Sequence, residues 1–206
     1  MGRGRDVVRF VEVAMDTKQV LKRYLQVGRD TLLWKLDGLS HYDARRPMVP
    51  TGTNLLGLVK HTASVEAGYL GAVFDRPFPD EPFPWFAEDA APNADMWATE
   101  DERQDDITAL YRRVWEHSDA TIEALDLDAR GRVPWWGVHG DVTLHTILVH
   151  VVTETHRHTG HADIVRELID GAVGLRVEST NVPDLDRRAW ADHHARVETA
   201  ARATDK

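Results

Sequence analysis

Glu154 and His158 are the two residues whose types and spacing most directly suggest chemistry. They lie in a histidine-rich segment, since six of the eleven histidines fall between residues 139 and 161. Their separation of four residues places both side chains on one face of a helix. On a helical wheel at about 100° per residue, both fall within the apolar stripe of that helix. The stripe is formed by Leu144, Ile147, Val151, Ala162, Val165 and Ile169.

A carboxylate in an apolar stripe is costly unless another group pairs with it. Two ligands from adjacent helical turns commonly begin a metal site, so Glu154 and His158 predict one. The third ligand must come from another helix, and His61 lies about 60° from the centre of the apolar face of its own segment. Two histidines and one glutamate leave a coordination position open, as in catalytic sites. We expect a divalent metal, zinc first, with nickel and iron as alternatives that accept the same ligands.

Other histidines fit less central roles. His150 and His161 lie at the edge of the stripe and are candidates for contacts around the metal or with a substrate. His156 and His145 fall on the opposite side of the wheel and are expected to face solvent. The alternative for the whole cluster is structural, with Glu154 simply hydrogen-bonded to a histidine or tyrosine in the core.

Aromatic and basic residues in the predicted loops are further candidates. Trp85, Trp135 and Trp136 lie in two loops that would cap the helices. They are either structural plugs or the walls of a pocket for a mostly apolar substrate. Arg45 and Arg46 are candidates for holding an anionic group. A line of small residues beside His61 predicts that a neighbouring helix approaches closely: Gly57, Ser64, Gly68 and Gly71.

Four long amphipathic segments must position these residues, and the sequence contains no strand pattern. The predicted helices span residues 16–38, 54–74, 99–125 and 142–170. Asp16 is a candidate N-cap, the TEDE sequence from Thr99 resembles a capping box, and Gly171 is a helix stop. A proline-rich connection, residues 76–95, is too long for a tight turn and is either a crossover or a lid. The pattern predicts an all-α four-helix bundle with long crossover loops.

The length of 206 residues is typical of one domain. We expect residues 1–14 to be a flexible extension, residues 15–174 to form the metal-binding bundle, and residues 175–206 to form a tail. Pro183 precedes a short amphipathic stretch over residues 185–200, which predicts a short C-terminal helix.

The formal net charge of −9 argues against nucleic acid and anionic membrane surfaces as partners. No apolar run approaches the roughly 20 residues of a membrane-spanning helix. The chain has no cysteine, which fits a cytoplasmic protein. Any thiol chemistry must therefore use a thiol supplied from outside. The sequence leaves the oligomeric state open, a homodimer included.

Three sequence blocks resemble the DinB-like superfamily. HVVTETHRHTGHADIVRELIDGAVG, residues 150–174, is similar to its fourth helix, and LVKHTASVE and VPWWG match at residues 58–66 and 133–137. The resemblance covers roughly residues 16–174. It is strongest to the branch that includes mycothiol-dependent maleylpyruvate isomerase and the mycothiol S-transferases. The most specific positions are Glu154, Arg157, His158, Gly160, His161 and Asp163.

This resemblance implies a four-helix bundle whose divalent metal is held by His61, Glu154 and His158. It also implies a low-molecular-weight thiol such as mycothiol as co-substrate, activated by the metal and transferred to an electrophilic small molecule. We expect the tail to be too short for the separate C-terminal domain of the isomerases, which favours a stand-alone transferase-type or uncharacterised member. Two alternatives stay open. One is a hydrolase that uses metal-bound water; the other is a non-catalytic bundle that binds a metal or ligand in a stress response.

Overall fold

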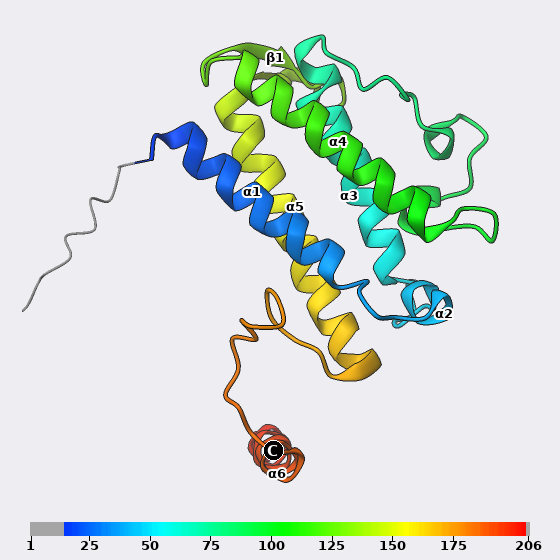
Figure 1. Ribbon diagram of the computed structural model, residues 1–206, viewed down its shortest axis with the longest axis vertical. Coiled ribbons are helices and arrows are strands. Elements are labelled where there is room, and N and C mark those ends of the chain that lie inside the picture. Colours follow the sequence, from blue (N-terminus) through cyan, green and yellow to red (C-terminus); the bar gives the residue numbers. More distant parts are fainter. Residues whose placement is uncertain (1–14, 205–206) are drawn as a thin grey trace, which may run out of the picture.

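The computed structural model describes residues 15–204, and the predicted extension over residues 1–14 lies outside them. The chain forms an all-α four-helix bundle, as predicted (Figure 1). Helix α5 packs against both α1 and α3, and α4 packs against α3 and, less extensively, against α1. The four helices are α1 (Thr17–Trp34), α3 (Leu55–Leu70), α4 (Gln104–Ala124) and α5 (Leu144–Asp170).

Most helix boundaries follow from their capping residues. Asp16 caps α1 in a full capping box with Gln19, and α5 ends where Gly171 takes a left-handed conformation with φ of 84°. The prediction that the third helix begins at Thr99 was wrong. Glu102 does accept the Thr99 backbone N–H at 2.7 Å, but its carboxylate also pairs with Lys60, and α4 begins only at Gln104.

Helices α3 and α4 run in the same direction, which explains the long connection between them (Figure 1). The chain leaves α3 through the 3-10 helix η1 (Ala72–Phe74) and returns along the bundle through η2 (Pro84–Phe86) and η3 (Ala94–Met96). Segment η3 packs beside α3, so the connection brings the chain back to the level at which α3 starts. The proline-rich segment is therefore a crossover that covers α3.

Several short elements in the loops escaped prediction. Residues Arg130–Arg132 (β1) and Asp141–Thr143 (β2) form an antiparallel pair around the 3-10 helix η4 (Pro134–His139). Strands of three residues are too short to show an alternating pattern, which is why the sequence gives no sign of them. The loop after α1 contains the five-residue helix α2 (His41–Arg45), capped by Ser40.

The tail beyond the bundle contains α6 (Arg187–Ala203), close to the predicted amphipathic stretch. Asp186 caps α6, none of its residues is buried, and Figure 1 shows it beyond the end of α5. Within residues 15–204, no helix combines the length and the hydropathy that a membrane crossing requires.

Candidate metal centre

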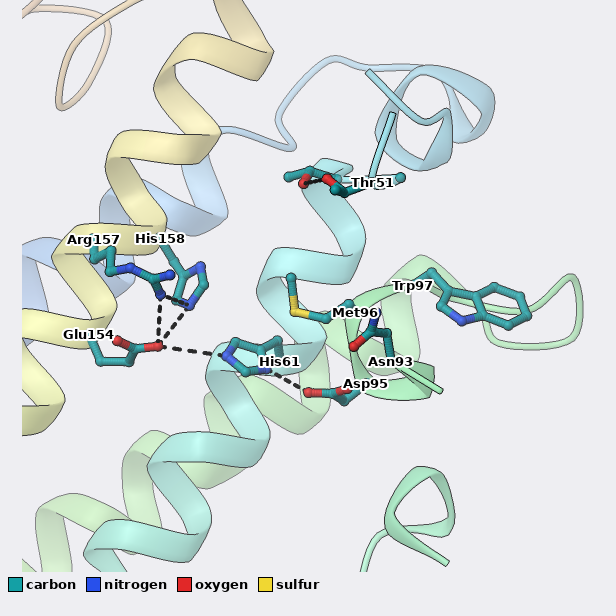
Figure 2. Close-up of a pocket in the computed structure, with 11 residues that line it drawn as sticks. Thr51, His61, Asn93, Asp95, Met96, Trp97, Glu154, Arg157 and His158 are labelled. Carbon is teal, nitrogen blue, oxygen red and sulfur yellow. Dashed lines mark hydrogen bonds and ion pairs between the residues drawn. The ribbon is translucent and has the colours of Figure 1, made fainter. Parts of the chain in front are cut away.

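His61, Glu154 and His158 converge between α3 and α5, as Figure 2 shows. Each offers one ligand atom, and the three atoms lie within 4.8 Å of one another. His158 Nε2 lies 2.9 Å from Glu154 Oε1, and His61 Nε2 lies 3.8 Å from the same oxygen. The two imidazole rings meet edge to face with centroids 4.7 Å apart. The structure thus brings together the three residues that the helical wheels select.

The orientation of His61 is set by a carboxylate that the sequence analysis did not identify. Asp95 Oδ2 lies 2.6 Å from His61 Nδ1, and this hydrogen bond lowers the pKa of Asp95. An ionised Asp95 accepts a hydrogen bond from the Nδ1–H group of His61. The proton of the neutral imidazole therefore stays on Nδ1, and the lone pair of Nε2 points towards Glu154 and His158. Carboxylate–histidine pairs of this kind are the usual support of a metal-binding imidazole.

Asp95 is held in place because η3 lies directly on the N-terminal part of α3. An ideal Cβ on Gly57 would come within 1.7 Å of the Met96 carbonyl oxygen, so only glycine allows this contact. The Asn54 side chain donates to the same oxygen at 3.2 Å. Lys60, which is buried, donates to the Ala94 carbonyl at 2.8 Å. The line of small residues predicted the close approach of a neighbouring helix. At Gly57 the segment that approaches closely is the crossover.

The protonation states of the α5 pair suit metal binding. Burial lowers the pKa of His158 to about 4, and the nearby His61 acts in the same direction. His158 is therefore neutral near pH 7. Burial alone would raise the pKa of Glu154, but the hydrogen bond with His158 and the charges of its neighbours outweigh it, and the pKa is lowered. Neutral imidazole and ionised carboxylate are the forms that bind a cation.

The three groups therefore fit a divalent cation by both chemistry and placement. Two imidazole nitrogens and one carboxylate oxygen are ligands that zinc, nickel and iron all accept. Their open side faces a pocket of about 470 Å³, large enough for a small molecule. The pocket is lined by Thr51, Gly52, Thr53, His61, Asn93, Asp95, Met96, Trp97, Glu154, Arg157 and His158.

Two of the other predicted histidines lie near this centre without lining the pocket. His161 Nδ1 is 3.4 Å from His158 Nδ1, so it can orient the buried imidazole from behind. His150 lies one helical turn before Glu154 and packs on Tyr69, with ring centroids 4.6 Å apart. Trp135 and Trp136 both donate to the Tyr69 hydroxyl, at 3.0 and 3.1 Å. These aromatic residues form a cluster two turns further along α3 than His61.

The remaining predicted substrate residues are engaged elsewhere. Trp85 stacks on Phe83 with centroids 4.8 Å apart and donates to Ser64 at 2.9 Å, which makes it a plug between the crossover and α3. Arg45 donates to the carbonyl oxygens of residues 99 and 102, and Arg46 pairs with Asp43. None of the three lines the pocket at the triad.

His156 does not face solvent freely, contrary to the wheel. It is half-buried, and its Nε2 donates to the Tyr24 carbonyl of α1 at 2.9 Å. The wheel was centred on the face towards α3, whereas α5 packs on two helices and is covered over a wider arc. His145 is exposed, as predicted.

Sequence reasoning missed Asp95 as a site residue and assigned no role to Arg157. Asp95 lies in a loop without periodicity, among many other acidic residues, so nothing local marks it. Arg157 did stand within the motif that carries the DinB-like resemblance. Its Nη1 lies 3.2 Å from both Glu154 Oε1 and His158 Nε2.

The four-helix bundle, its long crossover and the candidate metal centre agree with the resemblance to the DinB-like superfamily. A family model described as mycothiol-S-transferase matches residues 20–171. The chain belongs to the mycothiol-S-transferase family. A crystal structure described as the conserved protein of a locus from Enterococcus faecalis is similar in fold, with a TM-score of 0.56 and 18% identity over 77% of this chain and 99% of that chain. No curated protein was found to match the sequence.

Proposed function

We propose that this protein transfers a low-molecular-weight thiol of the mycothiol type to an electrophilic small molecule. The reaction would take place at a divalent-metal centre formed by His61, Glu154 and His158. The observation that carries the proposal is the convergence of these three ligand atoms on an open pocket, in a chain of the mycothiol-S-transferase family. Zinc is the metal we expect, and the cytoplasm, where thiols are kept reduced, is the expected location.

A bound divalent cation would lower the pKa of a coordinated thiol and favour the thiolate, which is the nucleophilic form. The residues of the chain prepare the centre for this task. Asp95 holds the proton of His61 on Nδ1 and so keeps Nε2 free. His158 is neutral because it is buried. Glu154 supplies the one negative charge among the three ligands, so a divalent ion with these ligands would carry a net positive charge and attract an anionic sulfur.

The pocket supplies room for the second substrate next to the sulfur. Met96 and Trp97 contribute apolar surface, and Thr51, Thr53 and Asn93 contribute polar groups. A pocket of about 470 Å³ that combines both kinds of surface is typical of small-molecule sites. Holding thiol and electrophile side by side would turn a bimolecular reaction into an effectively unimolecular one.

The proposal is tested by loading untagged protein with zinc, nickel or iron, titrating it with mycothiol, and assaying transfer to monochlorobimane by mass spectrometry. We expect about one metal per chain and metal-dependent formation of the conjugate. Glu154→Gln and His158→Ala should each weaken metal binding by more than about 100-fold, because even residues that only support a ligand contribute 10–100-fold.

His156→Ala is the matched control, since His156 lies on the same helix but faces α1. It should keep both metal binding and transfer, with the helices of all variants verified by circular dichroism. Protein that takes up no stoichiometric metal under any of these conditions would refute the proposal. Metal-loaded protein that ignores thiols but cleaves simple esters or amides would instead establish the hydrolase alternative.

A further inference from the structure

Arg157 is a positive charge of the chain itself, placed against two of the three ligand atoms of the triad. Its Nη1 lies 3.2 Å from Glu154 Oε1 and 3.2 Å from His158 Nε2. Figure 2 shows the guanidinium reaching over from the same helix to these two side chains. The Arg157 side chain is 58% exposed, so these polar contacts, rather than burial, hold it at the site.

The contacts of His158 Nε2 with Arg157 and with Glu154 cannot both be hydrogen bonds at once. If Nε2 carries the proton, it donates to Glu154 at 2.9 Å, and its N–H then opposes the N–H of Arg157. If Nε2 is unprotonated, it accepts from Arg157, and its lone pair then faces the lone pairs of Glu154. A neutral imidazole nitrogen cannot be donor and acceptor at once. Arg157 favours the second arrangement, because its positive charge reaches both Nε2 and the Glu154 carboxylate and offsets the repulsion between their lone pairs.

A metal ion bound by His158 would use the one lone pair of Nε2, which Arg157 contacts in this structure. At this nitrogen the metal and Arg157 therefore exclude each other, and at Glu154 their two positive charges would repel. We propose that Arg157 competes with the metal for Glu154 and His158 and that, once displaced, it binds an anionic group of the substrate at the pocket mouth. This inference rests on the proposed metal centre and deepens it by naming a carboxylate-bearing electrophile as the substrate class.

The charges around the pocket support the second half of the proposal. Among the described residues that line it, Arg157 is the single lysine or arginine. Asp95 is already committed to His61, and the other residues near the mouth, such as Thr51, Asn93 and Trp97, are uncharged. A guanidinium binds a carboxylate through two parallel hydrogen bonds, which fixes orientation as well as position. A displaced Arg157 would thus align an acidic electrophile beside the metal.

The first experiment measures zinc affinity by competition with a fluorescent chelator. Arg157→Gln removes the competing charge and should bind zinc about fivefold more tightly at low salt, the upper end expected for an exposed charge pair. The gain should shrink as salt is added, because the charge is exposed. Arg113→Gln is the matched control. Arg113 is similarly exposed at 53% and paired with a carboxylate, that of Asp80, but it lies outside this pocket.

The second experiment follows the guanidinium directly. Zinc should make Arg157 more reactive towards phenylglyoxal, measured by peptide mass spectrometry, while the reactivity of Arg113 should not change. On zinc-loaded protein, succinate should bind wild type about tenfold more tightly than Arg157→Gln, as expected for a partly exposed charge-assisted contact. Uncharged succinamide should not distinguish the two proteins. Arg157→Lys should recover part of the succinate binding because it keeps the charge.

The outcomes separate this inference from the proposed function. Zinc binding by Arg157→Gln that equals or falls below that of wild type would overturn the competition, since Arg157 would then orient Glu154 for the metal. Equal succinate affinities of wild type and Arg157→Gln would overturn the substrate role. In both cases the metal centre itself would stand. If neither wild type nor Arg157→Gln binds zinc, the inference and the proposed metal centre fall together.

Discussion

Two glutamates of the bundle, Glu66 and Glu154, show how differently the same side chain can be used inside one fold. Glu66 lies on α3 with a side chain that is 0% exposed, and Arg29 binds both of its carboxylate oxygens. Glu154 lies on α5, is 24% exposed, and faces the imidazoles of His61 and His158. Glu66 comes only five positions after His61 along α3, so one helix presents both environments on different faces.

The difference lies in whether the cluster satisfies itself. Arg29 binds Glu66 and also Asp119, at 2.9 Å, so the charges of that network are paired by protein groups. The triad instead brings three potential electron-pair donors together, and among the described residues that line its pocket Arg157, which is exposed, is the one arginine or lysine. We call the Arg29, Glu66 and Asp119 network closed, because its charges pair with one another, and such a network stabilises the fold. Convergent lone pairs instead provide ligands for a cation. Burial of polar groups alone therefore does not identify a functional site, whereas potential metal ligands that converge on an open pocket indicate one.

The comparison is tested most strongly by breaking the closed network. Arg29→Met leaves Glu66 buried without its partner, and we expect the free energy of unfolding to fall by about 3–5 kcal/mol. Urea denaturation monitored by circular dichroism measures this loss. The double variant Arg29→Met with Glu66→Leu should recover much of it, because an apolar replacement removes the uncompensated charge. A single variant as stable as wild type would contradict the structural role of the pair.

The support of the open site gives the next largest effect. Asp95→Asn keeps the size of the side chain but removes the charge that holds the proton on His61 Nδ1. We expect metal affinity to fall by about 10–100-fold, the range found for carboxylates that support a metal-binding histidine. Calorimetric titration with zinc measures it, and Asp89→Asn, in the same crossover but outside the pocket, is the control. Equal zinc affinities of Asp95→Asn and wild type would remove Asp95 from the site.

The helices and the converging residues could be predicted because they obey local rules. Helix α5 carries a regular apolar stripe and ends at Gly171. Glu154 and His158 are polar residues on the same helix face as that stripe, which makes them conspicuous in the sequence. His61 could be predicted as the third ligand because its own helix also shows a clear apolar face. The same rules failed for His156, because a wheel centred on one packing face does not show that α5 contacts two helices.

The rest of the site could not be predicted because it depends on contacts between distant segments. Asp95 reaches His61 only because the crossover runs back along α3 and lies on Gly57. The sequence showed a long proline-rich connection but not its path, since loops lack a repeating pattern. Trp85 shows the same limit. The sequence left it as either a structural plug or a pocket wall, and only its hydrogen bond with Ser64 identifies it as a packing residue.

Gly57→Ala tests whether the path of the crossover matters to the site. The added methyl group would come within 1.7 Å of the Met96 carbonyl, so η3 must shift. Overpacking costs about 1–3 kcal/mol, and the gain in helix propensity returns about 1 kcal/mol. We expect a net loss of about 1 kcal/mol in stability, with a fall in zinc affinity because Asp95 moves with η3. Gly160→Ala, a helix position with no atom within 4 Å of the added Cβ, is the control and should keep zinc affinity.

The smallest effect on stability should come from Glu154 itself, which completes the comparison with Glu66. Glu154→Gln keeps the shape of the side chain and removes a charge that is partly exposed and shared between His158 and Arg157. Without metal, the free energy of unfolding should change by no more than about 0.5 kcal/mol, as for most substitutions outside a closed buried network. Urea denaturation in the presence of a chelator measures this change. A carboxylate retained for ligand binding contributes little to the fold, so a loss of the size expected for Arg29→Met would show that Glu154 is structural.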